Sequence, residues 1–448
     1  MSPPGKKLAR WLGLDFHILS TLMYRSWGIV SGAVMLLFMP VWFTSVEQGY
    51  YYTFASLLGL QIFFELGLNY VVMQQVSHEY AHVSRAADGS LQGDATHLDR
   101  LADLHAILRR WYRRAALAFW LVVGSVGTVF FSQRPDLTWT HWLPVWLTLV
   151  TVVSGNLYFS PMMAMLEGCG MVGQIARMRL KQAIVGSLLS WTLLSLGANL
   201  YAVPVLPTLG LIMTVIWLRR HGGILHQLQA RAQGPMVHRL SWRTDIFPFQ
   251  WRIALSWVSG YFIFQLFSPV LFAFRGPVEA GRVGMGLALF HALSTVGMSW
   301  VNAKAPQFGA HIARAERDAL NRLFVTITQR SLAFITLGAF GILAGTRFLQ
   351  HMQWPIAERL PDLAVLACLA LVTIANTVVF AAAAYMRAHR EEPMLVPSVT
   401  VGLLNLLAVT VGAQHSTWLP MVLYAALTLG VSLPWTAWLF LPYFRRTS

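Results

Sequence analysis

Residues 363–386 read LAVLACLALVTIANTVVFAAAAYM, and no charged side chain occurs between Asp362 and Arg387. A membrane-spanning helix needs about 20 mostly apolar residues, so this stretch predicts one crossing of a lipid bilayer. Similar apolar runs recur along the chain, and the charged residues gather between them. The pattern predicts an all-α polytopic membrane protein.

The composition agrees with repeated membrane crossing. Of 448 residues, 56% are hydrophobic and 11% are charged, whereas a soluble domain carries about 25% charged residues. The formal net charge of +15 would indicate a nucleic-acid partner in a soluble protein. Here the excess of Lys and Arg is better explained by cytoplasmic loops that set the topology and contact anionic membrane lipids. We therefore expect no nucleic-acid partner.

Motifs for catalysis, metal binding or secretion are not found in the sequence. Cys169 and Cys368 are far apart, which indicates neither a disulfide framework nor a metal site. The histidines lack metal-ligand spacing, and there is no Walker sequence. The first twenty residues lack the apolar core of a cleaved signal peptide. We predict no catalytic residue, no metal and no cofactor, so the energy source would be an ion gradient (H⁺ or Na⁺), the membrane potential or consumption of the product.

The apolar runs between charged loops predict about twelve spans. They are 22–45, 49–76, 114–132, 140–164, 182–199, 203–218, 249–272, 282–303, 324–345, 362–386, 393–412 and 418–443. The fifth and sixth are separated only by Ala198–Pro204, which predicts a tight hairpin.

The distribution of basic residues predicts that both termini are cytoplasmic. This orientation places 26 Lys and Arg residues on cytoplasmic segments and 5 outside, with Arg25 and Arg252 within or beside spans. One missed span would destroy the asymmetry, because every later loop would change side. The predicted location is therefore the bacterial inner membrane, crossed many times.

The segments between spans predict how the chain is organised. Residues 1–220 form an N-terminal six-helix lobe, 221–246 a cytoplasmic linker and 247–448 a C-terminal six-helix lobe. Within 96–114, leucines recur at helical spacing among Asp and Arg residues. This pattern is typical of a basic amphipathic helix that lies on the inner leaflet.

The second half reads as a diverged copy of the first. Pro40, then Glu47-Gln-Gly49, a span and His82-Val-Ser-Arg-Ala86 correspond to Pro269, then Glu279-Ala-Gly281, a span and His311-Ile-Ala-Arg-Ala315. Each half has six spans, so both halves enter the membrane from the same side. Such repeats are related by an axis along the membrane normal and enclose a substrate path between them.

Ionisable residues inside spans are costly unless they face a cavity or a partner, and they are therefore functional candidates. Arg25 and Arg252 occupy equivalent positions in the first and seventh spans. Two guanidinium groups that face one cavity would hold a phosphate or pyrophosphate. The alternative is that each arginine reaches the headgroups of the inner leaflet from a helix end.

Two polar stripes run along spans. Gln61, Glu65 and Asn69 are four residues apart on the second span, and Glu65 could carry a coupling proton, bind a cation or form a structural ion pair. The second stripe, on the eighth span, has Lys304 at its inner end. Its hydroxyl and amide groups could bind sugar hydroxyls or only join helices. Its members are His291, Thr295, Ser299 and Asn302.

The chain resembles the polysaccharide-unit flippases of the multidrug/oligosaccharidyl-lipid/polysaccharide exporter superfamily. The resemblance rests on Arg25, on Pro40 and Gly49, on Glu65-Leu-Gly-Leu68, and on Met165-Leu-Glu-Gly-Cys-Gly170. It implies two six-helix lobes around a central cavity and alternating access. It also implies a cationic site, to which Arg25, Arg252 and Lys304 correspond. The implied substrate is an undecaprenyl-pyrophosphate-linked oligosaccharide for O-antigen, capsule or exopolysaccharide, and the implied partners are membrane lipids and other polysaccharide-assembly proteins.

Three other functions compete with this interpretation. An ion-coupled multidrug exporter of the same fold would use Glu65, although paired arginines would repel cationic drugs. A membrane glycan polymerase or ligase would need a large exterior loop, which the predicted topology lacks. A scaffold for glycan assembly would transport nothing.

Overall fold

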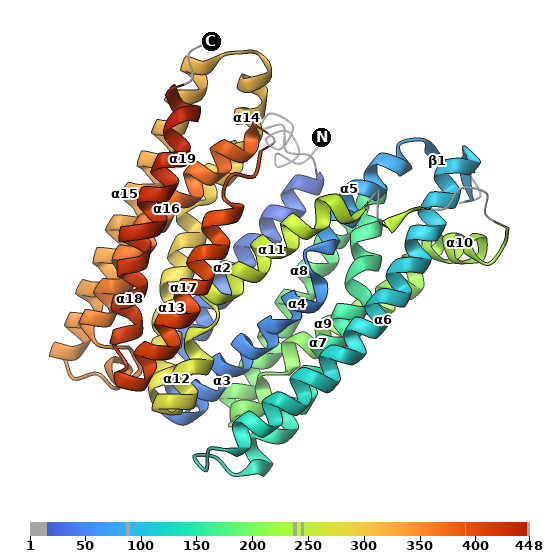
Figure 1. Ribbon diagram of the computed structural model, residues 1–448. Coiled ribbons are helices and arrows are strands. Elements are labelled where there is room, and N and C mark those ends of the chain that lie inside the picture. Colours follow the sequence, from blue (N-terminus) through green and yellow to red (C-terminus); the bar gives the residue numbers. More distant parts are fainter. Residues whose placement is uncertain (1–15, 87–89, 236–239, 243–245, 390, 446–448) are drawn as a thin grey trace, which may run out of the picture. The chain divides into compact units, whose positions relative to one another are not determined.

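The computed structural model describes residues 16–86, 90–235, 240–242, 246–389 and 391–445 (Figure 1). Within these ranges the chain is almost entirely helical, which confirms the predicted fold class. Seven basic residues of the charge count lie outside them, and the sidedness of the termini stays a prediction. These residues are Lys6, Lys7, Arg10, Arg239, Arg243, Arg390 and Arg446.

The spans follow the predicted order. Nine continuous stretches of described residues are long and apolar enough to cross a membrane, and two bent helix pairs raise this number to 11. One of the nine, Trp139–Ser195, is 57 residues long and contains the predicted fourth span and most of the fifth. At 1.5 Å per residue, it would be about 85 Å long if straight, against a hydrocarbon core of about 30 Å. The protein is therefore a multi-pass membrane protein.

The chain divides into two compact units. Unit 1 contains the described residues of Met1–Phe38 and Leu60–Trp257, and unit 2 contains those of Met39–Gly59 and Val258–Ser448. The second span is therefore divided: its first helix belongs to unit 2, and the rest of the span belongs to unit 1. The predicted lobe and linker boundaries are not tested by this division and stay predictions.

Unit 1 is a helical bundle with a short hairpin, in which Ser84 of one strand lies opposite Gln92 of the other. Its elements are α2 (Phe16–Trp42, to Phe38), the end of η1 (Gly59–Gln61), α4 (Ile62–Glu65), α5 (Leu68–Tyr80), β1 (Val83–Arg85), β2 (Leu91–Gly93), α6 (Ala95–Ser132), α7 (Trp139–Leu166), η2 (Glu167–Met171), α8 (Val172–Ser195), η3 (Asn199–Ala202), α9 (Val205–His221), α10 (Gly223–Ala232) and α11 (Phe247–Phe264, to Trp257). The predicted hairpin at Ala198–Pro204 is confirmed, since only η3 separates α8 from α9.

The amphipathic segment 96–114 is helical, but its predicted position on the leaflet is wrong. It forms the first half of α6 and continues into the third span without a break. Its leucines, Leu98, Leu101, Leu104 and Leu108, are buried. Much of this cover comes from α10, a helix of the predicted linker that packs against α6. Burial of each leucine stabilises this contact by roughly 1.5–3 kcal/mol, so protein covers the apolar face.

Buried acids join these elements at the end of unit 1 that is predicted to be cytoplasmic. Glu79 lies 2.6 Å from His97 Nδ1 and 3.3 Å from Arg100 Nε. Asp99 accepts a 2.7 Å bond from Arg231 of α10, and Asp103 accepts one from the Leu240 amide at 2.9 Å. Because a buried carboxylate without a partner is costly, these contacts specify how α10 and residue 240 attach to α6.

Unit 2 is a second bundle. Its elements are α3 (Ser45–Leu58), the end of α11, α12 (Phe267–Arg275), α13 (Pro277–Gly297), α14 (Ser299–Ala313), α15 (Arg317–His351), η5 (Pro355–Arg359), α16 (Leu363–Ala388), α17 (Leu395–His415), α18 (Leu419–Leu427), η6 (Thr428–Ser432) and α19 (Leu433–Arg445). Asn405 of α17 stabilises the break between α11 and α12. Its amide donates to the carbonyl oxygens of Phe262 and Ile263, at 2.7 and 3.5 Å. Broken membrane helices need such donors and acceptors, because the hydrocarbon core supplies none.

The repeat seen in the sequence has a counterpart in unit 2. Glu47 and Glu279 are each the third residue of their helices, α3 and α13, and Gly49 and Gly281 follow two positions later. The two glycines meet: a Cβ atom on Gly281 would lie 2.8 Å from the Gly49 nitrogen. Equivalent residues of two repeats touch each other only near the axis that relates them. The contact therefore supports the repeat.

Both repeats also bend at the same place. The helix that contains Gly49 bends by 45° beyond Glu65, and the helix that contains Gly281 bends by 40° at Met298. Leu66 follows Gly49 by 17 residues, and Met298 follows Gly281 by 17. The bend is thus a shared feature of the second and eighth spans, and it lies beside both predicted polar stripes.

Candidate functional site

The second span is broken directly after Glu65. Leu66 has φ +52° and Gly67 has φ +64°, so two consecutive residues are left-handed and α4 cannot continue into α5. Glycine is needed at the second position for a further reason. A Cβ atom there would lie 2.5 Å from the Cγ2 methyl group of Ile253 on α11. The break places the Glu65 carboxylate at a helix end inside the membrane-spanning region.

Glu65 belongs to a chain of three hydrogen-bonded side chains. The Asn69 amide donates to Glu65 Oε1 at 2.7 Å, and the Tyr112 hydroxyl donates to Asn69 Oδ1 at 3.2 Å. Tyr112 is fully buried, whereas Glu65 and Asn69 are half-buried. Within the described residues no basic side chain pairs with Glu65, so the structural ion pair that the sequence left open is not found. The carboxylate is therefore available to a proton or a cation.

Gln61, the third member of the predicted stripe, ends the 3₁₀ turn η1 and is half-buried. Tyr112 was missed by the sequence analysis. It lies in the segment 96–114, which was interpreted as a surface helix, and only the packing of α6 brings its hydroxyl to Asn69.

The two predicted anion-binding arginines are both in unit 1. Arg25 is on α2 and Arg252 is near the start of α11, and both side chains are exposed. Among the described residues neither has an acidic partner, and Arg252 has its guanidinium 5.6 Å from the ring centre of its neighbour Trp251. A guanidinium on an apolar helix without a carboxylate partner retains its full capacity to bind an anion.

The second polar stripe lies on unit 2 and is exposed along its whole length. His291 and Thr295 are on α13, while Ser299, Asn302 and Lys304 follow on α14. The Thr295 hydroxyl donates to the His291 carbonyl oxygen at 2.8 Å, as hydroxyl groups on membrane helices commonly do. The other polar groups of the stripe form no hydrogen bond with described residues, so they are available to a ligand.

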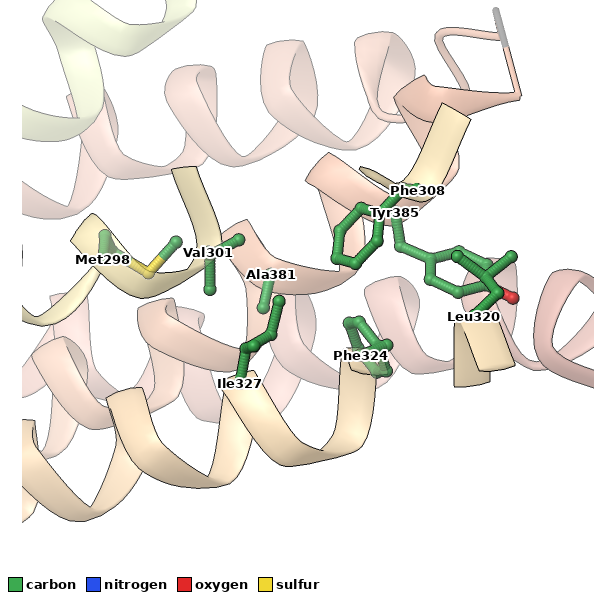
Figure 2. Packing of buried hydrophobic residues seen from close by; sticks show 8 residues of the cluster. All are labelled: Met298, Val301, Phe308, Leu320, Phe324, Ile327, Ala381 and Tyr385. Carbon is green, nitrogen blue, oxygen red and sulfur yellow. The ribbon is translucent and has the colours of Figure 1, made fainter. Parts of the chain in front are cut away.

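The opposite face of α14 explains why the stripe is exposed. Met298, Val301 and Phe308 point into an apolar cluster with α15 and α16 (Figure 2). The cluster is completed by Leu320, Phe324, Ile327, Ala381 and Tyr385. Since one side of α14 is held in this core, helical periodicity turns Ser299 and Asn302 away from it.

The predicted site residues therefore divide into two groups of five. Unit 1 holds Arg25, Gln61, Glu65, Asn69 and Arg252, and unit 2 holds His291, Thr295, Ser299, Asn302 and Lys304. Within the described residues, direct hydrogen bonds join only Glu65 to Asn69 and Thr295 to His291. The roles of all ten stay predictions.

The fold is similar to that of known transporters. A solved structure of an inward-facing multidrug resistance MATE family transporter of the MOP superfamily matches with a TM-score of 0.58 and 13% identity, over 93% of this chain and 99% of its own. The chain has a MATE-like transporter fold with two lobes. At this identity the similarity shows the fold alone.

Two further structures match with lower scores. An outward-facing MATE transporter gives a TM-score of 0.47 at 11% identity, over 96% of this chain and 95% of its own. A MOP superfamily transporter from Pyrococcus furiosus, described with a binding pocket of reverse polarity, gives 0.48 at 12% identity over 96% and 95%. No protein-family model and no curated protein sequence matches the chain.

Proposed function

We propose that the protein is a flippase that moves undecaprenyl-pyrophosphate-linked oligosaccharide units from the cytoplasmic to the periplasmic leaflet by alternating access. The proposal is consistent with the fold, since the neighbouring structures are transporters rather than enzymes. Two lobes that rock about a central substrate would expose it to each side in turn.

The observation that carries the proposal is the state of Arg25 and Arg252. Both guanidinium groups lie on apolar helices of one compact unit, both are exposed, and neither is neutralised by a described carboxylate. An ionisable group in a membrane span is costly, so by default it is a candidate for function. Forked N–H donors match the oxygen atoms of a pyrophosphate, and charge assistance makes such bonds strong. Lys304 would contribute a further positive charge from unit 2.

The polar stripe of unit 2 would bind the sugar units. Its hydroxyl, amide and imidazole groups are exposed, and most have no partner in the described protein. Such groups can both donate to and accept from sugar hydroxyls. The polyprenyl tail would stay in the bilayer, because an apolar chain is more favourably placed among lipid tails than in water.

Glu65 would couple transport to an ion gradient. Its carboxylate is half-buried, has no basic partner among the described residues and is held by Asn69. Glu65→Gln preserves an acceptor for the Asn69 amide, so the fold should survive. We expect this variant to reach normal levels in the membrane but to lose its response to the H⁺ or Na⁺ gradient. A gradient response equal to that of the wild type would exclude Glu65 as the coupling group.

The first test is the sidedness of the lipid-linked oligosaccharide in a deletion strain. A membrane-impermeant glycan-binding probe is applied to intact and opened spheroplasts. We expect the glycan to accumulate on the inner side, and we expect rescue by the wild type but not by the Arg25→Ala/Arg252→Ala variant. Arg220→Ala is the matched control, because Arg220 is equally exposed but lies at the end of α9. Normal outward glycan in the deletion strain would exclude the flippase.

Glu65, which has no basic partner among the described residues, also favours a second candidate, an ion-coupled multidrug exporter. An acidic group without a described basic partner is suited to a cationic drug, and the inward-facing structure of similar fold is described as a multidrug resistance transporter. Drug susceptibility of the deletion strain separates the two candidates. Raised susceptibility that Glu65→Gln fails to correct, together with normal glycan sidedness, would favour drug export.

A further inference from the structure

One face of α6 changes from basic to apolar over a short length of helix. Arg110, Arg113 and Arg114 are exposed, and Leu117 and Leu121 on the same face are 59% and 49% exposed. At 3.6 residues per turn, these five residues cover about a third of the helix circumference. The face therefore presents charged and apolar groups one after the other along a single line.

The opposite face of this stretch is fixed in the core of unit 1. Its members are all buried, and they are Leu108, Tyr112, Ala115, Ala116 and Phe119. Because α6 is one continuous helix that is held on this side, its basic and apolar residues are turned outward together. The three arginines therefore point to the surroundings of unit 1 and not to its interior.

The three arginines have no acidic partner among the described residues. The nearest acids before them on α6 are Asp99 and Asp103, which already accept hydrogen bonds from Arg231 and from the Leu240 amide. Like charges three and four residues apart on a helix repel each other. An anion between the guanidinium groups would relieve this repulsion, and their N–H donors match the oxygen atoms of a phosphate.

Tryptophan occurs at the same level of α6 as the arginines. Trp111 is 42% exposed, and its ring centre lies 6.5 Å from that of Trp242. The segment that contains Trp242 is attached here, since the Leu240 amide donates to Asp103. Tryptophan rings favour the boundary between lipid headgroups and tails. In the predicted topology this boundary is that of the inner leaflet.

The apolar part of the face is long enough for a lipid tail. The seven residues from Arg114 to Leu121 rise about 10 Å along the helix, and half of the hydrocarbon core is about 15 Å thick. A phosphate bound at the arginines would thus place its acyl chain along Leu117 and Leu121. A free phosphate or a nucleic acid would use the basic residues alone.

We propose that this face of α6 is a binding site for one anionic phospholipid of the inner leaflet. Arg110, Arg113 and Arg114 bind its phosphate, and Leu117 and Leu121 contact its acyl chain. Anionic lipids are common in the cytoplasmic leaflet and are attracted to basic clusters at its surface. The bound lipid stabilises α6 by neutralising three adjacent positive charges. The proposal does not depend on the proposed flippase function.

Binding is tested by native mass spectrometry of the purified protein, titrated with phosphatidylglycerol or phosphatidylcholine. We expect Arg110→Gln/Arg113→Gln/Arg114→Gln to raise the dissociation constant of the first phosphatidylglycerol at least tenfold, with little change for phosphatidylcholine. Without lipid, this variant should melt at or above the wild-type midpoint, because the repulsion is removed. Equal dissociation constants for wild type and variant would overturn the site.

A control variant loses the same charge elsewhere on unit 1. It is Arg219→Gln/Arg220→Gln/Lys181→Gln, whose three residues are all exposed. Arg219 and Arg220 are consecutive, so they point about 100° apart on α9, and Lys181 is on α8. We expect this variant to bind the first phosphatidylglycerol as the wild type does. A loss equal to that of the α6 variant would mean that net charge binds the lipid, and it would overturn the site.

Photo-crosslinking locates the lipid in a bilayer. p-Benzoylphenylalanine replaces Leu117, or Leu407 as the matched control, because Leu407 is 62% exposed on α17. The protein is placed in liposomes with equal amounts of phosphatidylglycerol and phosphatidylcholine. We expect adducts at position 117 to favour phosphatidylglycerol at least threefold, and those at position 407 to show no preference. Equal ratios at both positions would overturn the proposal.

Competition identifies the occupant. Inorganic pyrophosphate and polyprenyl pyrophosphate are each added to the complex with phosphatidylglycerol, at the same concentration as that lipid. We expect neither to displace more than half of it. Displacement by inorganic pyrophosphate would overturn the role of the apolar residues. Displacement by polyprenyl pyrophosphate alone would overturn the phospholipid and assign the site to the polyprenyl lipid.

Discussion

Gly67→Ala adds one methyl group at the break that positions Glu65, and two separate costs follow from the structure. An L-residue with φ +64° costs about 1–2 kcal/mol relative to glycine. The new Cβ atom would also lie 2.5 Å from the Ile253 Cγ2 methyl group, and such overpacking costs about 1–3 kcal/mol. The lower entropy of alanine in the unfolded chain offsets less than about 1 kcal/mol. We expect a net loss of about 2–4 kcal/mol.

Three further variants separate the conformational cost from the overpacking cost. Gly170→Ala meets only the conformational cost, since φ is +84° there but no atom lies within 4 Å of the new Cβ. Gly210→Ala meets neither cost, because Gly210 is in α9 with open space around it. Gly67→Ala/Ile253→Leu removes the clash, because leucine has no methyl group branching from Cβ.

The assay is thermal unfolding of the purified protein in detergent, followed by tryptophan fluorescence. We expect Gly210→Ala to melt at or above the wild-type midpoint, Gly170→Ala below it and Gly67→Ala lowest. The double variant should return to about the midpoint of Gly170→Ala. If Gly67→Ala has the same melting midpoint as Gly210→Ala, the left-handed break in the second span is wrong. If the leucine gives no recovery, the contact between α5 and α11 is wrong.

Three shorter predictions concern the packing of each unit. Asn405→Ala leaves two carbonyl oxygens at the break of α11 without their donor, so we expect a loss of about 1–3 kcal/mol and a lower melting midpoint; an unchanged midpoint would refute that role. Arg231→Ala removes the cation from buried Asp99, and because the arginine side chain is 37% exposed we expect only about 1–2 kcal/mol but faster proteolysis within α10. Equal proteolysis rates would mean that the ion pair does not hold α10. Gly127→Ala would place a Cβ atom 2.1 Å from the indole ring of Trp146 on α7, so we expect it to lower the free energy of unfolding by about 1–3 kcal/mol. Gly124→Ala makes an ordinary 3.5 Å contact and should be neutral. Equal melting midpoints for the two variants would contradict the packing of α6 on α7.

The sequence by itself predicted the helical membrane fold, the order of the spans and the internal repeat. These features depend on local properties of the chain. A run such as 363–386 crosses the membrane because its own residues are apolar, whatever surrounds it. The match between Gly49 and Gly281 was readable because a duplicated segment keeps its residue types at similar spacing. Polar residues on one face, such as Ser299 and Asn302, were found from helical periodicity alone.

The tertiary structure decided which of these residues meet. Tyr112 joins the Glu65 site from a segment whose sequence resembles that of a surface helix. Helix α10 covers this segment, although the sequence pattern of α10 does not indicate where it docks. Helix α3 packs on unit 2, while the first part of α11, with Arg252, packs in unit 1. Each of these facts depends on contacts between residues far apart in the chain. Hydropathy and periodicity describe which face of a helix will be buried, but shape complementarity between glycines and side chains selects the partner that buries it.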